Sequence, residues 1–192
     1  MSSLLRSEWY SLEEYFALER ASERRFEYRN GEIICMSGGS IRHAAIAFNI
    51  SSQFGANLRG RPCRVYGSDL AVYVPQGLPY RYPDVSVVCG EPRVRIVDGR
   101  DCLENPVLLV EVLSPASADY DLGTKFEQYK SIPDFTEYLL VEQDRPHAIR
   151  RTKRDVNSWH ETVFDAVDAT VRLESIAVDL PMREIYEGVS FQ

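Results

Sequence analysis

The sequence has no apolar run that approaches the roughly 20 residues required by a membrane-spanning helix. Its start, MSSLLRSEWYSLEEYF, lacks a long apolar core and soon becomes acidic, which is not typical of a signal peptide. We therefore expect a cytoplasmic protein with no membrane partner.

Cysteine is scarce, and no two cysteines form a CxxC pair. The four cysteines are Cys35, Cys63, Cys89 and Cys102. Their spacing supports neither a zinc site nor a disulfide framework. The sequence predicts reduced thiols with a structural role.

Basic residues are outnumbered by acidic ones, 22 to 29, which gives a formal net charge of −7. Because phosphate binding depends on Lys and Arg, this balance argues against nonspecific coating of nucleic acid but leaves room for a local basic groove. The densest basic run, residues 145–154, favours either an edge strand protected by charge or one wall of such a groove. The basic residues proposed for the wall are Arg150, Arg151, Lys153 and Arg154.

No internal repeat or linker rich in Pro and Gly divides the chain, so residues 1–192 are predicted to form a single domain. Ser11 followed by Glu14 indicates a capping box that opens a short first helix. Asn30 and Gly31 lie between two strand-like runs, which is typical of a tight hairpin.

A second helix is predicted to begin at Ser40. Ile46, Ile50 and Phe54 recur every four residues and therefore share one face of this helix. His43 lies on the same side, one turn earlier, and is expected to point inward. It is either a buried histidine with a structural partner or a phosphate contact and proton donor at the helix start, where it could assist a leaving group.

The rest of the chain alternates between strands and short helices. Strands are predicted over residues 63–75, 82–90, 106–115 and 136–142, with a helix over 121–132; further antiparallel strands follow in 147–173, and a terminal helix opens at Pro181. The central order is helix, three strands, helix, strand. This order predicts an α/β or α+β domain with a mixed sheet.

Glu111 interrupts the aliphatic run PVLLVEVLSP, which otherwise indicates a strand buried on both faces. A carboxylate in such a place must be neutralised, paired or bound to a cation. The sequence up to this point allows either a buried Lys or Arg or a metal ion as the partner of Glu111.

Asp84 directly follows Pro83, at the start of the neighbouring strand. Taken alone, it could be an ordinary turn residue. Two carboxylates on adjacent strands, Asp84 and Glu111, would however suffice for Mg²⁺ or Mn²⁺ if water and substrate phosphate fill the remaining positions.

The Pro83-Asp84 pair, the strand with Glu111 and the order of elements together resemble the PD-(D/E)xK nuclease superfamily. Within it, the sequence is similar to the Uma-two family, a bacterial group labelled as restriction endonucleases. The matching stretches are RFEYRNGEI, the helix beginning with His43, PDVSVV, LLVEVLSPAS and DLGTKFEQYKSIPDFTEYLLV, which cover most of residues 24–142. The resemblance implies a restriction-endonuclease-like fold and a metal-dependent phosphodiesterase.

The sequence departs from the superfamily at the position two residues after the glutamate, where Leu113 replaces the usual lysine. The family resemblance implies that the following helix supplies the lysine, and Lys125 fits. On a helical wheel Lys125 borders the apolar stripe, with Asp121 one turn before it on the same flank, so its ammonium could reach Glu111. Without the motif it would be taken for a surface lysine.

Glu27 is a weaker candidate, because strand alternation with Phe26 and Tyr28 also permits a solvent-facing side chain. The resemblance implies a place for Glu27 in the active site, through a metal-bound water. Together these residues predict an endonuclease dependent on Mg²⁺ or Mn²⁺ that acts on nucleic acid, most naturally DNA. The residues leave the oligomeric state open, and a homodimer is expected by analogy with enzymes that cut both strands. The alternatives are a noncatalytic nucleic-acid-binding or regulatory module on the same fold, and a protein that only binds a partner.

Overall fold

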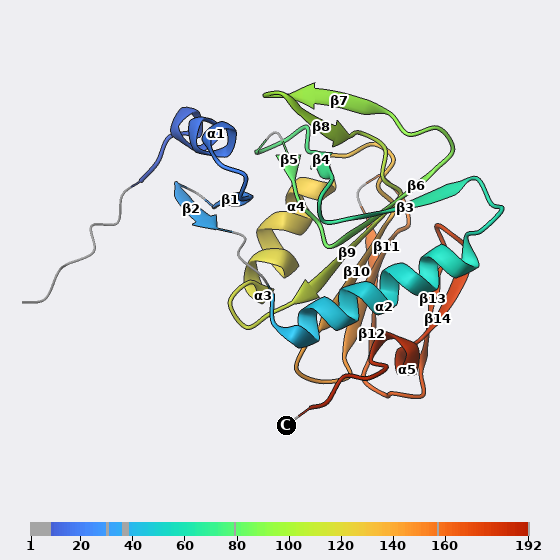
Figure 1. Cartoon of the computed structure of the whole chain (residues 1–192). Helices are drawn as coiled ribbons and strands as arrows, with labels where there is room; N and C mark the ends of the chain where they lie inside the picture. Colours follow the sequence, from blue (N-terminus) through green and yellow to red (C-terminus); the bar gives the residue numbers. More distant parts are fainter. Residues whose placement is uncertain (1–8, 30, 36–38, 79, 157, 192) are drawn as a thin grey trace, which may run out of the picture. The chain divides into compact units, whose positions relative to one another are not determined.

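The computed structural model describes residues 9–29, 31–35, 39–78, 80–156 and 158–191 (Figure 1). Contacts group these residues into two compact units, one up to Gly39 and one from Ser40 onward. Each unit is described by itself, and the single domain over residues 1–192 stays a prediction. None of the helices in the described residues is long and apolar enough to cross a membrane.

The first unit contains α1 (Leu12–Ala21), β1 (Phe26–Arg29) and β2 (Glu32–Cys35). The capping box is confirmed, because the Ser11 side chain accepts a hydrogen bond from the Glu14 N–H while the Glu14 carboxylate accepts one from the Ser11 N–H. β1 and β2 pair antiparallel, as the hairpin prediction requires. Asn30 lies outside the described residues.

The second unit is built on a six-stranded sheet with the order β12-β11-β10-β9-β6-β3. Its strands are β3 (Cys63–Gly67), β6 (Val85–Cys89), β9 (Leu108–Leu113), β10 (Glu137–Glu142), β11 (Ala148–Lys153) and β12 (Trp159–Phe164). Only β9 and β10 pair in parallel; the other neighbours are antiparallel. β9 is buried along its whole length, as its aliphatic run predicted.

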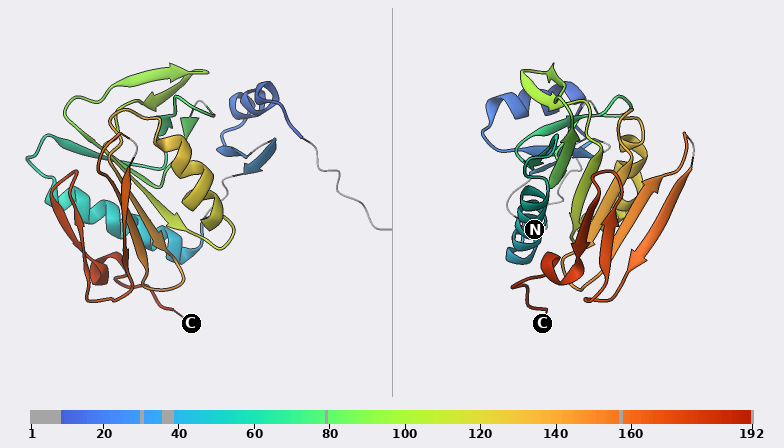
Figure 2. Two further views of the ribbon diagram at one scale, coloured as in Figure 1. Left: turned by 180° about the vertical axis from the view of Figure 1, so that it is seen from behind. Right: turned by 90° about the vertical axis from the view of Figure 1, so that its right-hand side faces the viewer.

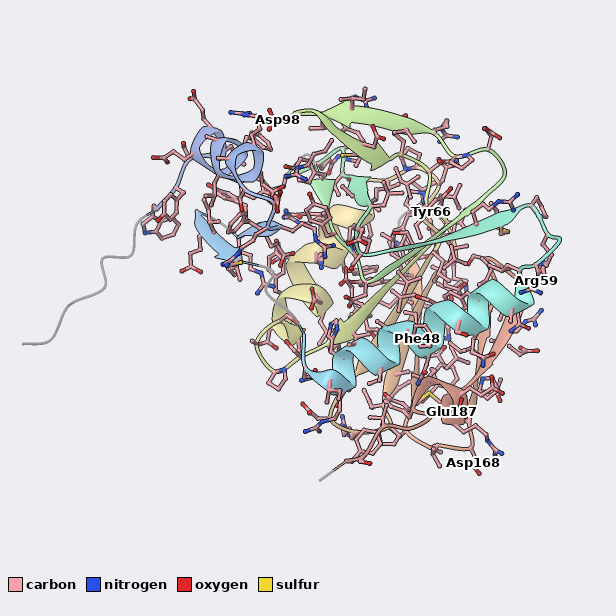
Figure 3. All side chains as sticks on the ribbon, in the orientation of Figure 1. Phe48, Arg59, Tyr66, Asp98, Asp168 and Glu187 are labelled. Atoms are coloured by element: carbon pink, nitrogen blue, oxygen red, sulfur yellow. A yellow bond between two sulfur atoms is a disulfide. The ribbon has the colours of Figure 1, made fainter. Side chains whose placement is uncertain are left out.

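Helices cover both faces of this sheet (Figure 2). On one face lies α2 (Ile41–Asn57), which buries Ile46, Ile50 and Phe54 and leaves Phe48 exposed (Figure 3). The hairpin of β13 (Thr170–Leu173) and β14 (Val178–Pro181), followed by α5 (Met182–Ile185), completes the same core cluster.

The other face is covered by the crossover between β9 and β10. It consists of α3 (Ala118–Tyr120), a π-helical turn η1 (Asp121–Lys125) and α4 (Phe126–Tyr129). The sequence predicted one regular helix over residues 121–132, and the helical segments at 118–129 with their π-helical turn correct that prediction. Phe126 and Tyr129 pack against the sheet in the second core cluster.

A second, four-stranded sheet has the order β5-β4-β8-β7. It comprises β4 (Ala71–Tyr73), β5 (Tyr80–Arg81), β7 (Val94–Val97) and β8 (Arg100–Leu103). The sequence predicted a single strand over residues 63–75, but a turn at residues 68–70 separates β3 from β4 and sends them to different sheets. The predicted order survives as α2, β3, β6, β9, α3 to α4 and β10, and the α+β fold class with a mixed sheet is confirmed.

The cysteine prediction was wrong in one respect, because Cys63 and Cys89 form a disulfide. They are direct partners in the antiparallel ladder of β3 and β6, with Cα atoms 4.0 Å apart. Spacing along the chain could not reveal this pair, since strand register sets it. Cys35 and Cys102 are free thiols.

Candidate active site

The register of β6 and β9 brings two carboxylates together. Val85 pairs with Val110, which places Asp84 opposite Glu111, one step beyond the last pair of the ladder. Alternate residues of β9 face opposite cores, and Glu111 shares the α4 face with its odd-numbered neighbours Leu109 and Leu113. Asp84 and Glu111 therefore lie opposite each other where the ladder of β6 and β9 ends, on adjacent strands as the sequence predicted.

The Asp84 carboxylate is held by two different elements. Its Oδ2 accepts a hydrogen bond of 2.7 Å from the Val112 N–H of β9, and His43 Nε2 of α2 lies 3.3 Å from the same oxygen. His43 occupies the first turn of α2, where Ser40 caps the helix by accepting from the His43 N–H. The hydrogen bond with Asp84 raises the pKa of His43 above its usual value, and burial opposes that rise.

Glu111 has two partners on the crossover helix. Lys125 Nζ lies 2.8 Å from Glu111 Oε1, and the Tyr129 hydroxyl donates to the same oxygen at 2.9 Å. The side chains of Glu111 and Lys125 are only 5% and 4% exposed. Burial raises the pKa of Glu111 well above its usual value, and the positive charge of Lys125 opposes this. Lys125 thus meets Glu111, as its helical position predicted.

Asp121 belongs to the cluster. From the sequence it was placed one turn before Lys125 but was not predicted to be a site residue. Its Oδ1 lies 3.2 Å from Lys125 Nζ, and its side chain is 4% exposed. The i, i+4 spacing to Lys125 was the available signal. The sequence did not reveal that Asp121 and Lys125 are the first and last residues of a π-helical turn. Such turns are found frequently at functional sites.

The two strand carboxylates suit a hard cation. Among the described residues, Asp84 Oδ1 and Glu111 Oε2 have no hydrogen-bond or ion-pair partner, so each carboxylate keeps one oxygen available. Nowhere in the described part of the chain do three or more His, Cys, Asp or Glu side chains converge to hold a metal ion. A divalent cation would therefore rest on these two carboxylates and on water or phosphate oxygens, a mode that Mg²⁺ commonly adopts.

Comparisons with known proteins identify the family of the chain. Residues 12–182 match the model of the Uma2 family, which is described as "Putative restriction endonuclease". The chain belongs to the Uma2 family. Two relatives from Synechocystis sp. are "Uncharacterized protein slr1290", 35% identical over 94% of this chain and 93% of its own, and "Uncharacterized protein sll1609", 34% identical over 68% and 73%.

A solved structure from Anabaena variabilis, described as a putative nuclease belonging to DUF820, resembles this Uma2 chain with a TM-score of 0.69. The match covers 88% of this chain and 93% of the other at 21% identity. At that identity the likeness shows the fold alone. It agrees with the restriction-endonuclease-like architecture expected from the sequence.

Glu27 lies in the first unit of the Uma2 chain. It is buried, and its Oε2 accepts hydrogen bonds from Arg29 Nε and Nη2 at 3.0 and 2.7 Å. The solvent-facing alternative for Glu27 is therefore wrong. Its place in the active site stays a prediction.

The basic run does not form one wall. β11 lies inside the sheet rather than at its edge, and Arg150 and Arg151 point to opposite faces. The Arg150 guanidinium donates to the Arg172 carbonyl, and Arg151 donates to the Leu122 carbonyl and to Glu161. The predictions of an edge strand and of a continuous basic groove over residues 145–154 are therefore both wrong.

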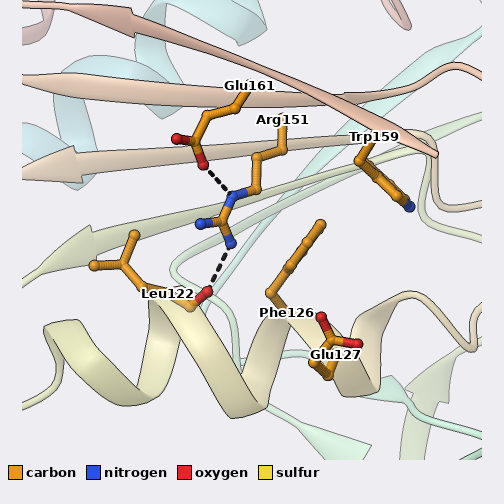
Figure 4. Close-up of a pocket in the computed structure, with 6 residues that line it drawn as sticks. All are labelled: Leu122, Phe126, Glu127, Arg151, Trp159 and Glu161. Carbon is orange, nitrogen blue, oxygen red and sulfur yellow. Dashed lines mark hydrogen bonds and ion pairs between the residues drawn. The ribbon is translucent and has the colours of Figure 1, made fainter.

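Arg151 instead borders a cavity of about 310 Å³ between the crossover helix and β12 (Figure 4). Its guanidinium lies over the Phe126 ring, 4.5 Å from the ring centre. The cavity is lined by Leu122, Phe126, Glu127, Arg151, Trp159 and Glu161. Because Arg151 is bound to Glu161 and to a backbone carbonyl, it supports the wall of this cavity rather than a nucleic-acid surface.

Proposed function

We propose that this protein is a nuclease that hydrolyses phosphodiester bonds of DNA with Mg²⁺ or Mn²⁺ held by Asp84 and Glu111. The observation that carries the proposal is the buried pair of Lys125 and Glu111 beside Asp84, with one oxygen of each carboxylate available. The description of the Uma2 family and that of the Anabaena protein support the same chemistry.

Each side chain has a role that follows from its contacts. When bound, a divalent cation would polarise the phosphodiester and lower the pKa of a water molecule. The Val112 N–H keeps the Asp84 carboxylate in place, and Lys125 orients the attacking water beside Glu111. His43 Nε2, next to Asp84, can donate a proton to the leaving oxygen.

The test is cleavage of supercoiled plasmid in the presence of Mg²⁺, Mn²⁺ or EDTA. A single-stranded RNA of equal length is treated in the same way as a second substrate. Wild type should nick the plasmid only with a divalent cation, and Asp84→Asn and Glu111→Gln should abolish nicking. Asp119→Asn, an exposed acid in α3, is the matched control and should cleave normally. Plasmid binding without nicking under every condition would instead establish the noncatalytic module.

Mn²⁺ binding can be measured without turnover. By mass action Mn²⁺ should raise the midpoint of thermal unfolding of wild type and of Asp119→Asn. If Asp84→Asn and Glu111→Gln respond as strongly as wild type, the metal site is elsewhere.

A homodimer remains part of the proposal, since two copies would let the enzyme cut both strands of a duplex. Light scattering after size exclusion should give about twice the monomer mass of 22.0 kDa. A monomeric protein that still cuts both strands of the duplex together would contradict the proposed homodimer.

A further inference from the structure

Arg81 is a buried cation for which the described residues supply no acidic partner. It lies in β5 and is only 3% exposed. Its Nη2 donates a hydrogen bond of 2.6 Å to the amide oxygen of Gln128, and the ring of Tyr120 lies 5.8 Å from its Cζ. Among the described residues its buried Nε has no hydrogen-bond partner, and no carboxylate lies within ion-pairing distance.

Such an arrangement is costly unless something else compensates the charge. A buried ion loses its hydration, and a neutral amide returns only part of that free energy. The other buried cations of the second unit are compensated: Lys125 lies between Glu111 and Asp121, and Arg150 approaches Glu137. Arg81 therefore stands apart from them, and an anion is the missing partner.

The position of Arg81 indicates which anion. Asp84 follows it by three residues in the chain. Gln128, its hydrogen-bond partner, follows Lys125 by three residues and is its neighbour on the surface of the crossover helix. The Arg81 guanidinium thus contacts the helix residue one turn beyond Lys125, and the chain leads from Arg81 directly to Asp84.

We propose that Arg81 binds a phosphate group of the nucleic-acid strand next to the active site. A guanidinium offers several N–H donors in a planar fork that matches phosphate oxygens. Here Nη1 makes no hydrogen bond within the described residues, so this fork retains a donor for a ligand, whereas the unpaired Nε is fully buried. The proposal that the phosphate belongs to a nucleic-acid strand rests on the nuclease function proposed above. The proposal that Arg81 binds an anion does not.

The experiment uses Arg81→Met, Arg81→Lys and the matched control Arg93→Met, in which an exposed arginine paired with Asp134 is removed. Inorganic phosphate should raise the midpoint of thermal unfolding of wild type and of Arg93→Met, but not of Arg81→Met. Without any ligand, Arg81→Met should unfold at a higher temperature than wild type because an uncompensated buried charge is gone. An arginine with only a structural role would give a lower temperature.

Binding of a DNA duplex in EDTA, measured against NaCl concentration, tests the strand as the source. Loss of one phosphate contact in Arg81→Met should flatten the log-log salt slope by about 0.9, with no change in Arg93→Met. If Arg81→Met keeps the wild-type salt slope but loses the response to inorganic phosphate, the nucleic-acid strand is not the source of the phosphate, and the site binds free phosphate.

A phosphate response in Arg81→Met equal to that of wild type would overturn the proposal altogether. If Arg81→Met does not fold, the decision passes to Arg81→Lys, which keeps the charge but loses the planar fork. A several-fold weaker phosphate response of Arg81→Lys supports the proposal, and an equal response overturns it. If wild type binds phosphate through Arg81 but never cleaves DNA, the nuclease function fails while the anion site stands.

Discussion

Glu111 keeps its carboxylate in the middle of a buried strand because Lys125 and Tyr129 both reach the same oxygen. The cluster around it contains three carboxyl groups, those of Glu111, Asp121 and Asp84, together with the Lys125 ammonium and the His43 imidazole. Burial disfavours the ionised form of Glu111, and a divalent cation bound beside it would stabilise that form. Electrostatics at this scale therefore agree with a metal site.

Lys125→Ala should separate hydrolysis from metal binding. Asp84 and Glu111 remain, so Mn²⁺ should still raise the midpoint of thermal unfolding. DNA cleavage should fall by ~10² or more, the scale for loss of a positioned acid or base. The free energy of unfolding without metal should fall by about 3 kcal/mol, because Glu111 and Asp121 lose their buried partner.

The control for this substitution is Lys130→Ala, which removes a partly exposed lysine paired with Glu127 on the same helix. It should change neither cleavage nor Mn²⁺ binding. Wild-type turnover in a well-folded Lys125→Ala protein would eliminate Lys125 as the catalytic lysine.

Asp121→Asn should loosen the Lys125 side chain, because the ion pair at 3.2 Å is weakened while the size of the side chain is kept. The chain has only three lysines, Lys125, Lys130 and Lys153, so selective ¹³C labelling at Cε gives three assignable signals. In wild type the two Hε atoms of Lys125 should be inequivalent, as in a fixed side chain. In Asp121→Asn they should become equivalent, and cleavage should fall about 10- to 100-fold.

Asp119→Asn again serves as the control and should leave all three lysine signals unchanged. Inequivalent Hε atoms in Asp121→Asn would show that Glu111 and Tyr129 suffice to fix Lys125. This measurement does not depend on any nuclease activity.

Among the elements, the crossover helix carries most of the site. Its π-helical turn ends at Lys125, and α4 then presents Tyr129 to Glu111. Phe126, on another side of the same helix, packs against Tyr138 and Trp159. This packing fixes the helix against the sheet, and the π-helical turn sets how Asp121 is aligned with Lys125.

The disulfide joins β3 to β6, the strand that Asp84 precedes. Replacing both Cys63 and Cys89 with Ser should lower the free energy of unfolding by about 3 kcal/mol, on a loop-closure argument for 26 residues. Urea unfolding measures this difference, and Cys35→Ser is the control. Thiol titration of oxidised wild type under denaturing conditions should find two free thiols, Cys35 and Cys102. Four free thiols would mean that the pair stays reduced.

At the scale of the whole molecule, the described residues fall into two units, and the cluster of Asp84, Glu111 and Lys125 lies entirely in the second. A fragment of residues 40–192 should therefore fold by itself and keep the rise in thermal midpoint with Mn²⁺. Circular dichroism and thermal unfolding measure both properties.

The full chain with Glu27→Gln is the companion to this fragment. It tests the predicted active-site role of Glu27 without removing the first unit. If the fragment and Glu27→Gln both lose the Mn²⁺ response, the first unit contributes to the metal site and the chain acts as one domain.

The sequence by itself determined the features that depend on neighbours along the chain. Side-chain periodicity set the buried face of α2, the continuous aliphatic run set the burial of β9, and Ser11 and Ser40 marked the starts of α1 and α2. From the burial of β9 it followed that Glu111 needs a partner. Lys125 was found only because its helical position and the family motif agreed.

Only the tertiary structure decided what depends on register and on packing between distant segments. It set Asp84 opposite Glu111, joined Cys63 to Cys89 and buried Arg81 with no carboxylate partner among the described residues. It also divided residues 63–75 between two sheets. These outcomes were beyond the sequence because a strand can pair in many registers with similar local energies, and only burial of the whole sheet selects one of them.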